Sequence, residues 1–127
     1  MKLRKVFLLK EATVDLEEGR LFYDLQEKGV GDYFFDCLIS DLECLKFYSG
    51  IHSKKFGFYR MLTKRFPFAV YYEIDKDIVE VVAILDMRGN PSLIQSKITH
   101  PDLGDFTLIP ICKKAAVLYQ EKLLQFH

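Results

Sequence analysis

Basic residues in the second half of the chain are the side chains whose types and spacing best suit binding chemistry. Arg60, Lys64 and Arg65 lie close together in the sequence, and Arg88 follows an apolar run. A guanidinium group offers a fork of N–H donors that matches a carboxylate or a phosphate, and an ammonium group offers a point charge to the same anions. These four residues, together with Tyr72, are our candidates for contacts with a target or a partner protein.

Each arginine also has a simpler explanation as a structural residue. At Arg60 and Arg65, a cation would keep a strand hairpin soluble and protect a sheet edge from pairing with other chains. For Arg88, the simpler explanation is an ion pair with Asp86 or Glu73. The sequence alone leaves these alternatives open.

The other reactive side chains form no catalytic or metal-binding set. His52 and His100 are single histidines without a paired carboxylate or cysteine, and the three cysteines have no metal-ligand spacing: Cys37, Cys44 and Cys112. We therefore expect no catalytic residue, no metal and no cofactor. The odd number of cysteines, the lack of a secretory signal and the lack of an apolar run near the ~20 residues that span a bilayer predict a reduced, cytoplasmic protein.

The charges balance overall but are unevenly distributed. The 18 basic and 18 acidic residues cancel, which argues against a protein that lives on nucleic acid through phosphate contacts. Residues 11–43 carry ten carboxylates and two cations, whereas residues 44–72 carry six cations and no carboxylate. This distribution predicts one acidic side and one basic side.

Hydrophobic periodicity predicts a strand followed by two helices. Val6–Leu9 is a short apolar run that is typical of a strand. Apolar residues at spacings of three and four predict one helix over residues 12–28, ended by Gly29, and a second helix that continues to Tyr48 and is ended by Gly50. A short glycine-rich connection between the two helices indicates an antiparallel hairpin.

Three segments rich in Val, Ile, Phe and Tyr predict strands: Phe58–Leu62, Pro67–Ile74 and Ile78–Leu85. Their short connections predict consecutive antiparallel pairing, and the almost unbroken apolar run of the third strand predicts burial on both faces. Tyr71 and Tyr72 face opposite sides of the sheet, so one belongs to the core and the other to a groove. The expected fold is α+β in the order β-α-α-β-β-β, a two-layer domain with the helix hairpin on one face of an antiparallel sheet.

The last quarter of the chain is predicted to extend this domain. We expect a loop over residues 92–109 and a C-terminal helix over residues 110–126, because apolar residues from Cys112 onward again step by four and three. The division is therefore 1–91 for the main unit and 92–127 for an extension of the same domain. The apolar stripe of that helix needs a partner, either the body of the chain or a second copy in a homodimer.

The ordered motifs of residues 6–91 resemble the RelE/ParE toxin superfamily. The similarity rests on the pattern Ala12…Asp15-Leu16…Phe22-Tyr23…Gln26…Gly29-Val-Gly31, on Arg60-Met-Leu62, on Arg65-Phe-Pro-Phe-Ala-Val-Tyr-Tyr-Glu73, on Val81-Val-Ala-Ile-Leu85 and on Asp86-Met-Arg-Gly-Asn-Pro91. The resemblance implies the toxin of a type II toxin–antitoxin pair, of the plasmid-stabilisation kind. Its partner would be a cognate antitoxin, a disordered segment that folds as a helix or strand along the toxin.

The two branches of this superfamily imply different chemistry. RelE-like toxins are ribosome-dependent messenger-RNA endonucleases, and cleavage by a 2′-hydroxyl needs a proton acceptor and cations for the developing phosphorane. Here Ala69 stands where those nucleases carry an arginine, and no tyrosine follows Arg88 closely. ParE-like toxins bind DNA gyrase and need no catalytic residues, although Gly89 replaces the second of their two adjacent arginines. The resemblance therefore favours a ParE-like gyrase inhibitor over an endonuclease or a non-toxic fold relative.

Overall fold

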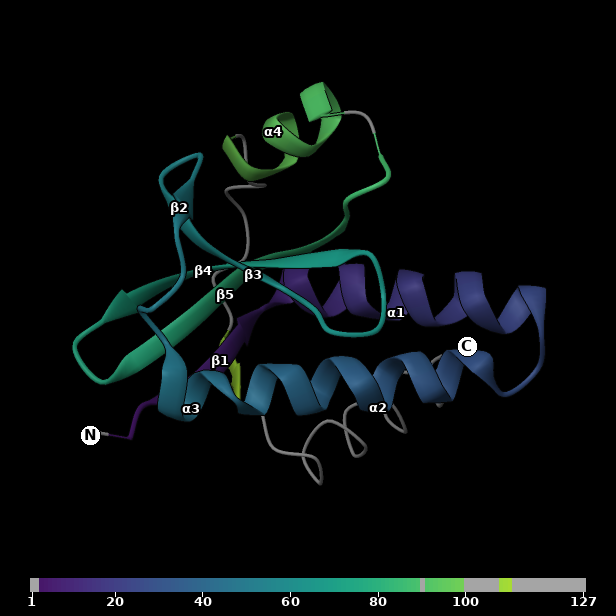
Figure 1. Ribbon diagram of the computed structural model, residues 1–127, viewed down its shortest axis with the longest axis horizontal. Coiled ribbons are helices and arrows are strands. Elements are labelled where there is room, and N and C mark those ends of the chain that lie inside the picture. The colour runs from purple at the N-terminus through teal and green to yellow at the C-terminus, as the bar shows by residue number, and fades with distance from the viewer. Residues whose placement is uncertain (1–2, 90, 100–107, 111–127) are drawn as a thin grey trace.

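A helical hairpin covers one face of a six-stranded sheet in the computed structural model, which describes residues 3–89, 91–99 and 108–110 (Figure 1). The elements are β1 Lys5–Leu9, α1 Lys10–Gln26, α2 Val30–Glu43, α3 Leu45–Tyr48, β2 Lys54–Lys55, β3 Phe58–Leu62, β4 Phe68–Asp75, β5 Ile78–Asp86, α4 Pro91–Thr99 and β6 Leu108–Pro110. The strand order is β2-β3-β4-β5-β1-β6, and only the β1–β5 pair is parallel among these strands. The predicted α+β fold, with the helical hairpin packed on one face of a mostly antiparallel sheet, is confirmed.

The hairpin forms as the periodicity predicts, with one difference at its end. Gly29 takes a positive φ of 94° between α1 and α2, a conformation that favours glycine. The second helix does not continue unbroken to Tyr48, because it is interrupted at Cys44. There the amide of Phe47 donates to the Cys44 carbonyl at 3.1 Å, a three-residue spacing that tightens the turn. Gly50, with φ 95°, follows α3 as expected.

The main core lies between the hairpin and the sheet. Leu38, Leu42 and Phe34 of α2 are completely buried, and they pack with the alternate residues of β4 and β5 that face them. Strand β5 lies between β4 and β1, so its buried apolar run is that of a central strand, as predicted. The β4–β5 ladder contains a bulge, since Tyr71 pairs with Ala83 and Tyr72 with Val81. This extra residue in β5 contributes to the weak alternation of apolar and polar residues along that strand.

An aspartate connects α1 to the sheet where β1 ends. The β1–β5 ladder reaches only Val81, since the chain turns into α1 after Leu9. Beyond that point the amide of Ile84 donates to the Asp15 carboxylate at 3.1 Å. The carboxylate thus replaces the backbone acceptor that a longer β1 would have supplied. Without it, the buried Ile84 amide would lack a hydrogen-bond partner, which costs free energy.

The second face of the sheet is covered by α4, which corrects the predicted loop over residues 92–99; β6 likewise replaces its end, and residues 100–107 lie outside the described residues. Ile94 and Ile98, one helical turn apart, are buried against Ala69, Tyr71, Ala83 and Leu85 in a second core. Pro91 begins this helix, a position where proline is tolerated because its missing N–H has no intrahelical acceptor. The groove that the alternation of Tyr71 and Tyr72 predicted on one face of the sheet is therefore absent over β4 and β5, where α4 covers the second face.

The rest of the C-terminal prediction is tested only at its start. Pro110 ends strand β6, which pairs with β1, instead of beginning a helix. The other residues of the expected helix, 111–126, lie outside the described residues. No helix within the described ranges is long and apolar enough to cross a membrane.

Candidate functional site

The structure brings three of the five candidate residues to one end of the sheet. Lys64 and Arg65 lie in the connection between β3 and β4, and Arg88 follows the end of β5. The amide of Met87 donates to the Pro67 carbonyl at 2.7 Å and joins the two segments. Arg60 lies elsewhere: it is paired in register with Tyr71, whose side chain belongs to the second core beneath α4.

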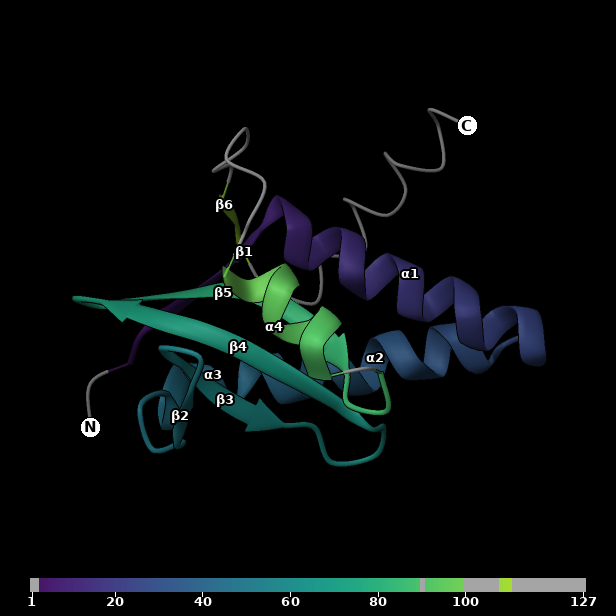
Figure 2. The same cartoon turned by 90° about the horizontal axis from the view of Figure 1, so that it is seen from above.

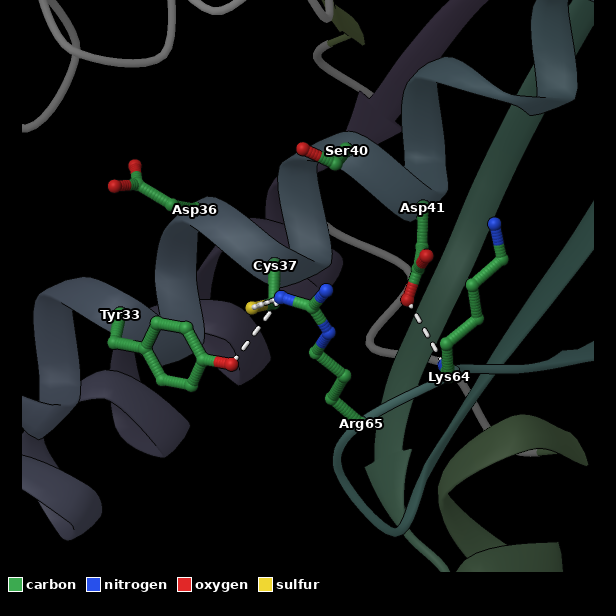
Figure 3. A pocket seen from close by; sticks show the side chains of 7 residues that line it. All are labelled: Tyr33, Asp36, Cys37, Ser40, Asp41, Lys64 and Arg65. Carbon is green, nitrogen blue, oxygen red and sulfur yellow. Dashed lines mark hydrogen bonds between the residues drawn. The ribbon is translucent and has the colours of Figure 1, made fainter.

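A groove between α2 and the β3–β4 connection holds Lys64 and Arg65 (Figure 3). Its volume is about 310 Å³, and its helical wall consists of Tyr33, Asp36, Cys37, Ser40 and Asp41. The nearly buried Asp41 carboxylate accepts the Lys64 amide at 3.1 Å, which fixes the connection against the helix. The acidic residues of the groove come from the helix and the cations from the connection.

Neutral groups hold the Arg65 side chain in place. Its Nη1 atom donates to the Tyr33 hydroxyl at 3.2 Å and lies 3.8 Å from the Cys37 sulfur (Figure 3). Interaction with Cys37, and then with Tyr33, raises the pKa of this guanidinium above its ordinary value. A positive charge held by neutral partners stays available to an anion from another molecule.

Arg88 is instead paired with an acid of its own chain. Its guanidinium contacts both carboxylate oxygens of Asp86, at 2.7 Å for the Nη2–Oδ2 pair, and its amide donates to Oδ1 at 2.9 Å. These bonds from Arg88 hold the pKa of Asp86 below its ordinary value. The same Nη2 atom donates to the Tyr23 hydroxyl of α1 at 3.3 Å. The structural alternative for Arg88, an ion pair with Asp86, is therefore present.

A row of aromatic rings lies between the two arginines, and sequence reasoning did not assign it to the site. The ring centroid of Phe66 is 5.8 Å from that of Tyr33 and 4.9 Å from that of Tyr23. Arg65 and Arg88 each donate to the hydroxyl of one of these tyrosines. The available signal was the placement of a Tyr in each helix and a Phe next to Arg65, but contacts this distant in sequence follow only from the fold.

Tyr72 is not at the surface, which corrects its assignment as a binding residue. Its exposed fraction is 0%, and its ring stacks on Tyr59 at 5.2 Å. The hydroxyl accepts the Gly50 amide at 2.9 Å and lies 2.5 Å from Nδ1 of His52. Tyr72 therefore ties the segment after α3 to the core and is not accessible to a partner. Tyr71, which faces the other side, is also buried, because α4 covers it.

Burial makes His52 sensitive to acid. It lowers the pKa of the imidazole below the ordinary 6.5, so the folded protein binds this proton less readily than the unfolded chain does. The stability that depends on neutral His52 is present above pH 6.5 and is lost as the pH falls below that value. We expect the melting temperature to fall between pH 7.5 and 5.5, and His52→Gln to flatten this dependence. Thermal scans at several pH values measure it, and an unchanged slope in His52→Gln would show that another group is responsible.

Comparison with known proteins identifies the fold. No protein-family model matches the chain, and no curated protein matches its sequence. One of three matching chains of solved structures comes from a structure described as "Chromosomal ParDE TA system from P. aeruginosa". The two chains align with a TM-score of 0.59 and 14% identity, over 65% of this chain and 94% of the other. The chain therefore has a ParE/RelE-type toxin fold, which confirms the resemblance at the level of fold.

Proposed function

We propose that this chain is the toxin component of a type II toxin–antitoxin system, that it acts in the cytoplasm by binding DNA gyrase, and that a cognate antitoxin neutralises it. The observation that supports the proposal is the ParE/RelE-type fold, shared over nearly the whole length of a chain from a ParDE structure. The composition of the sheet favours the gyrase-binding branch over the nuclease branch. Ala69, at the position where the nucleases carry arginine, is 0% exposed within the second core, beneath α4.

The antitoxin would bind at the end of the sheet where Arg65, Lys64 and Arg88 lie. The Arg65 guanidinium is oriented by Tyr33 and Cys37 before any partner arrives, so little side-chain entropy is lost when it binds a carboxylate. The half-exposed Tyr33 ring supplies apolar area next to this charge. An acidic segment with apolar residues would match this surface.

Charge reversal at Arg65 is expected to weaken antitoxin binding strongly. Arg65→Glu should raise the dissociation constant by at least about tenfold, equivalent to ~1.4 kcal/mol, because it removes one attraction and adds one repulsion. Isothermal titration calorimetry with the protein encoded next to this gene measures the change. Lys55→Glu changes the charge equally on β2, at the outer edge of the sheet, and should leave the affinity unaltered. Equal affinities of Arg65→Glu and the unaltered protein would remove this groove from the proposed interface.

Inhibition of supercoiling tests the target. Purified chain added to bacterial DNA gyrase and relaxed plasmid should reduce the formation of supercoiled plasmid, and the antitoxin should restore it. A parallel reaction contains the same purified chain with ribosomes and a translated messenger RNA, and it measures cleavage of that message. Cleavage of that message with normal supercoiling would contradict the proposal and favour the endonuclease.

One observation favours a second candidate, a fold relative without toxicity. Helix α4 covers the sheet face opposite the hairpin, where a binding groove was expected from the sequence. If α4 blocks function, Ile94→Asp should release the face and produce gyrase inhibition that the unaltered chain lacks. Inhibition by the unaltered chain would exclude this candidate.

A further inference from the structure

The outer face of α1 carries large apolar side chains that the described part of the molecule leaves uncovered. The exposed fractions are 45% for Val14, 50% for Leu21, 46% for Phe22 and 88% for Leu25. At 3.6 residues per turn, these four positions fall on one side of the helix. Figure 2 shows α1 at the margin of the helical layer, with α2 beside it. We call these four residues the α1 apolar face.

A groove runs along this face, between α1 and the C-terminal half of β5. Its volume is about 310 Å³, and Phe22 forms the wall that it shares with the α1 apolar face. Ile84 and Leu85 of β5 lie at the opposite wall. The apolar surface therefore continues from the helix into a depression where another side chain can be buried.

The charge around the α1 apolar face is negative. Glu18 is exposed within it, one turn from Val14 and from Leu21, and Asp15 lines the groove. Helix α1 contains two cations, Lys10 and Arg20. Lys10 lies one turn before Val14 on the same side, where the carboxylates of Asp15 and Glu18 outnumber it. Arg20 points away, since it binds Glu17 and lies 3.7 Å from Asp32 of α2. A partner for this face must supply cations as well as apolar side chains.

Two observations limit which kind of structural element can bind to the α1 apolar face. An added β-strand would need the Ile84 amide, but Asp15 already accepts its hydrogen at 3.1 Å. A second copy docked through the same face would bring Glu18 against Glu18, which like-charge repulsion disfavours. A helix laid along α1 meets neither obstacle, and the span from Val14 to Leu25 corresponds to about three turns.

We infer that the α1 apolar face and its groove bind an amphipathic helix of another protein, one with apolar residues along one side and Lys or Arg beside them. This site lies on the acidic helix α1, away from the Arg65 groove of α2, and it does not depend on the proposed toxin activity. The occupant has the opposite charge to the acidic segment expected at Arg65.

Binding of synthetic helices to the full chain tests the inference. The probe is a fluorescein-labelled Leu/Lys helical peptide of about four turns, and its control has the same Leu positions with Glu in place of Lys. Fluorescence anisotropy should give an affinity at least about tenfold higher for the Lys peptide. Leu21→Ser with Leu25→Ser should weaken its binding at least about tenfold, and Glu18→Lys at least about threefold. The double variant Phe47→Ser, Ile51→Ser removes exposed apolar area elsewhere and should bind normally.

Three results would overturn the inference. The first is a failed comparison in the anisotropy experiment: either the Lys and Glu peptides bind equally, or Phe47→Ser with Ile51→Ser weakens binding as much as Leu21→Ser with Leu25→Ser does. The second is self-association in analytical ultracentrifugation that Leu21→Ser with Leu25→Ser abolishes, which would assign the face to a second copy. The third is tighter, Leu25-dependent binding of a peptide with the sequence of residues 111–127, which would assign the face to the chain itself. Circular dichroism of each variant checks that the fold is retained.

Discussion

Phe34→Ala should lower the free energy of unfolding by about 4 kcal/mol, the usual cost of removing a large buried aromatic side chain without refilling its space. Phe34 is 0% exposed, and its ring lies within 5.0 Å of those of Tyr23, Phe66 and Phe68, measured between centroids. It therefore packs against Tyr23 and Phe66, two rings of the aromatic row between Arg65 and Arg88. Urea denaturation followed by circular dichroism measures the loss as a lower midpoint.

Phe22→Ala is the matched control for this prediction. It removes the same ring from the same hairpin, but Phe22 is nearly half exposed, so the loss should stay below about 1 kcal/mol. If both variants lose the same stability, the hairpin does not pack on the sheet as described. A loss at Phe34 together with weaker antitoxin binding would further indicate that the aromatic row orients Arg65.

Gly31→Ala should also lower the free energy of unfolding strongly, although it adds only one methyl group. In an ordinary helical position, alanine in place of glycine gains about 0.5–1 kcal/mol. Here a Cβ would collide with the carbonyl oxygen of Arg20 on α1 and would lie 2.8 Å from the Cβ of Asp24. Backbone atoms cannot rotate away, so the two helices must separate, and we expect a net loss of about 2–3 kcal/mol.

The change at Gly31 also disturbs a capping interaction. One carboxylate oxygen of Asp24 accepts the amides of Gly29 and Gly31, at 2.9 and 3.3 Å, and closes the turn between the helices. Ser40→Ala, an exposed small residue in the same helix, is the control and should change stability by less than about 0.5 kcal/mol. A stabilised Gly31→Ala protein would contradict the close approach of α1 and α2.

The elements with strong periodicity were predictable from the sequence. The bounds predicted for β3, Phe58–Leu62, are those of the structure, and the central burial of β5 followed from its apolar run. Helix α4 was not predicted because Ile94 and Ile98, the residues whose burial the structure describes in this helix, give a single i, i+4 pair. Such a pair becomes meaningful only when the second sheet face that it covers is known.

The candidate site was only partly predictable, because the type of a residue does not specify which other residues of the chain it will contact. Lys64 and Arg65 were placed correctly in a connection at the surface, but their contacts with Asp41, Tyr33 and Cys37 involve residues far away in the sequence. Alternation placed the two adjacent tyrosines on opposite faces and could not show that both faces would be covered. For that reason the prediction of Tyr72 as a binding residue is wrong, since Tyr72 belongs to the core.

The helix α4 gives the molecule two levels of local stability. Within the described residues, the main core joins both hairpin helices to the sheet, whereas the second core holds α4 chiefly through Ile94 and Ile98. Amides of α4 should therefore exchange with solvent deuterium through a sub-global opening, while those of β4 and β5 exchange only on global unfolding. In that partly open state the sheet face over Ala69 and Tyr71 is exposed while the hairpin stays folded. Access to that face is then governed by an opening equilibrium of the protein itself.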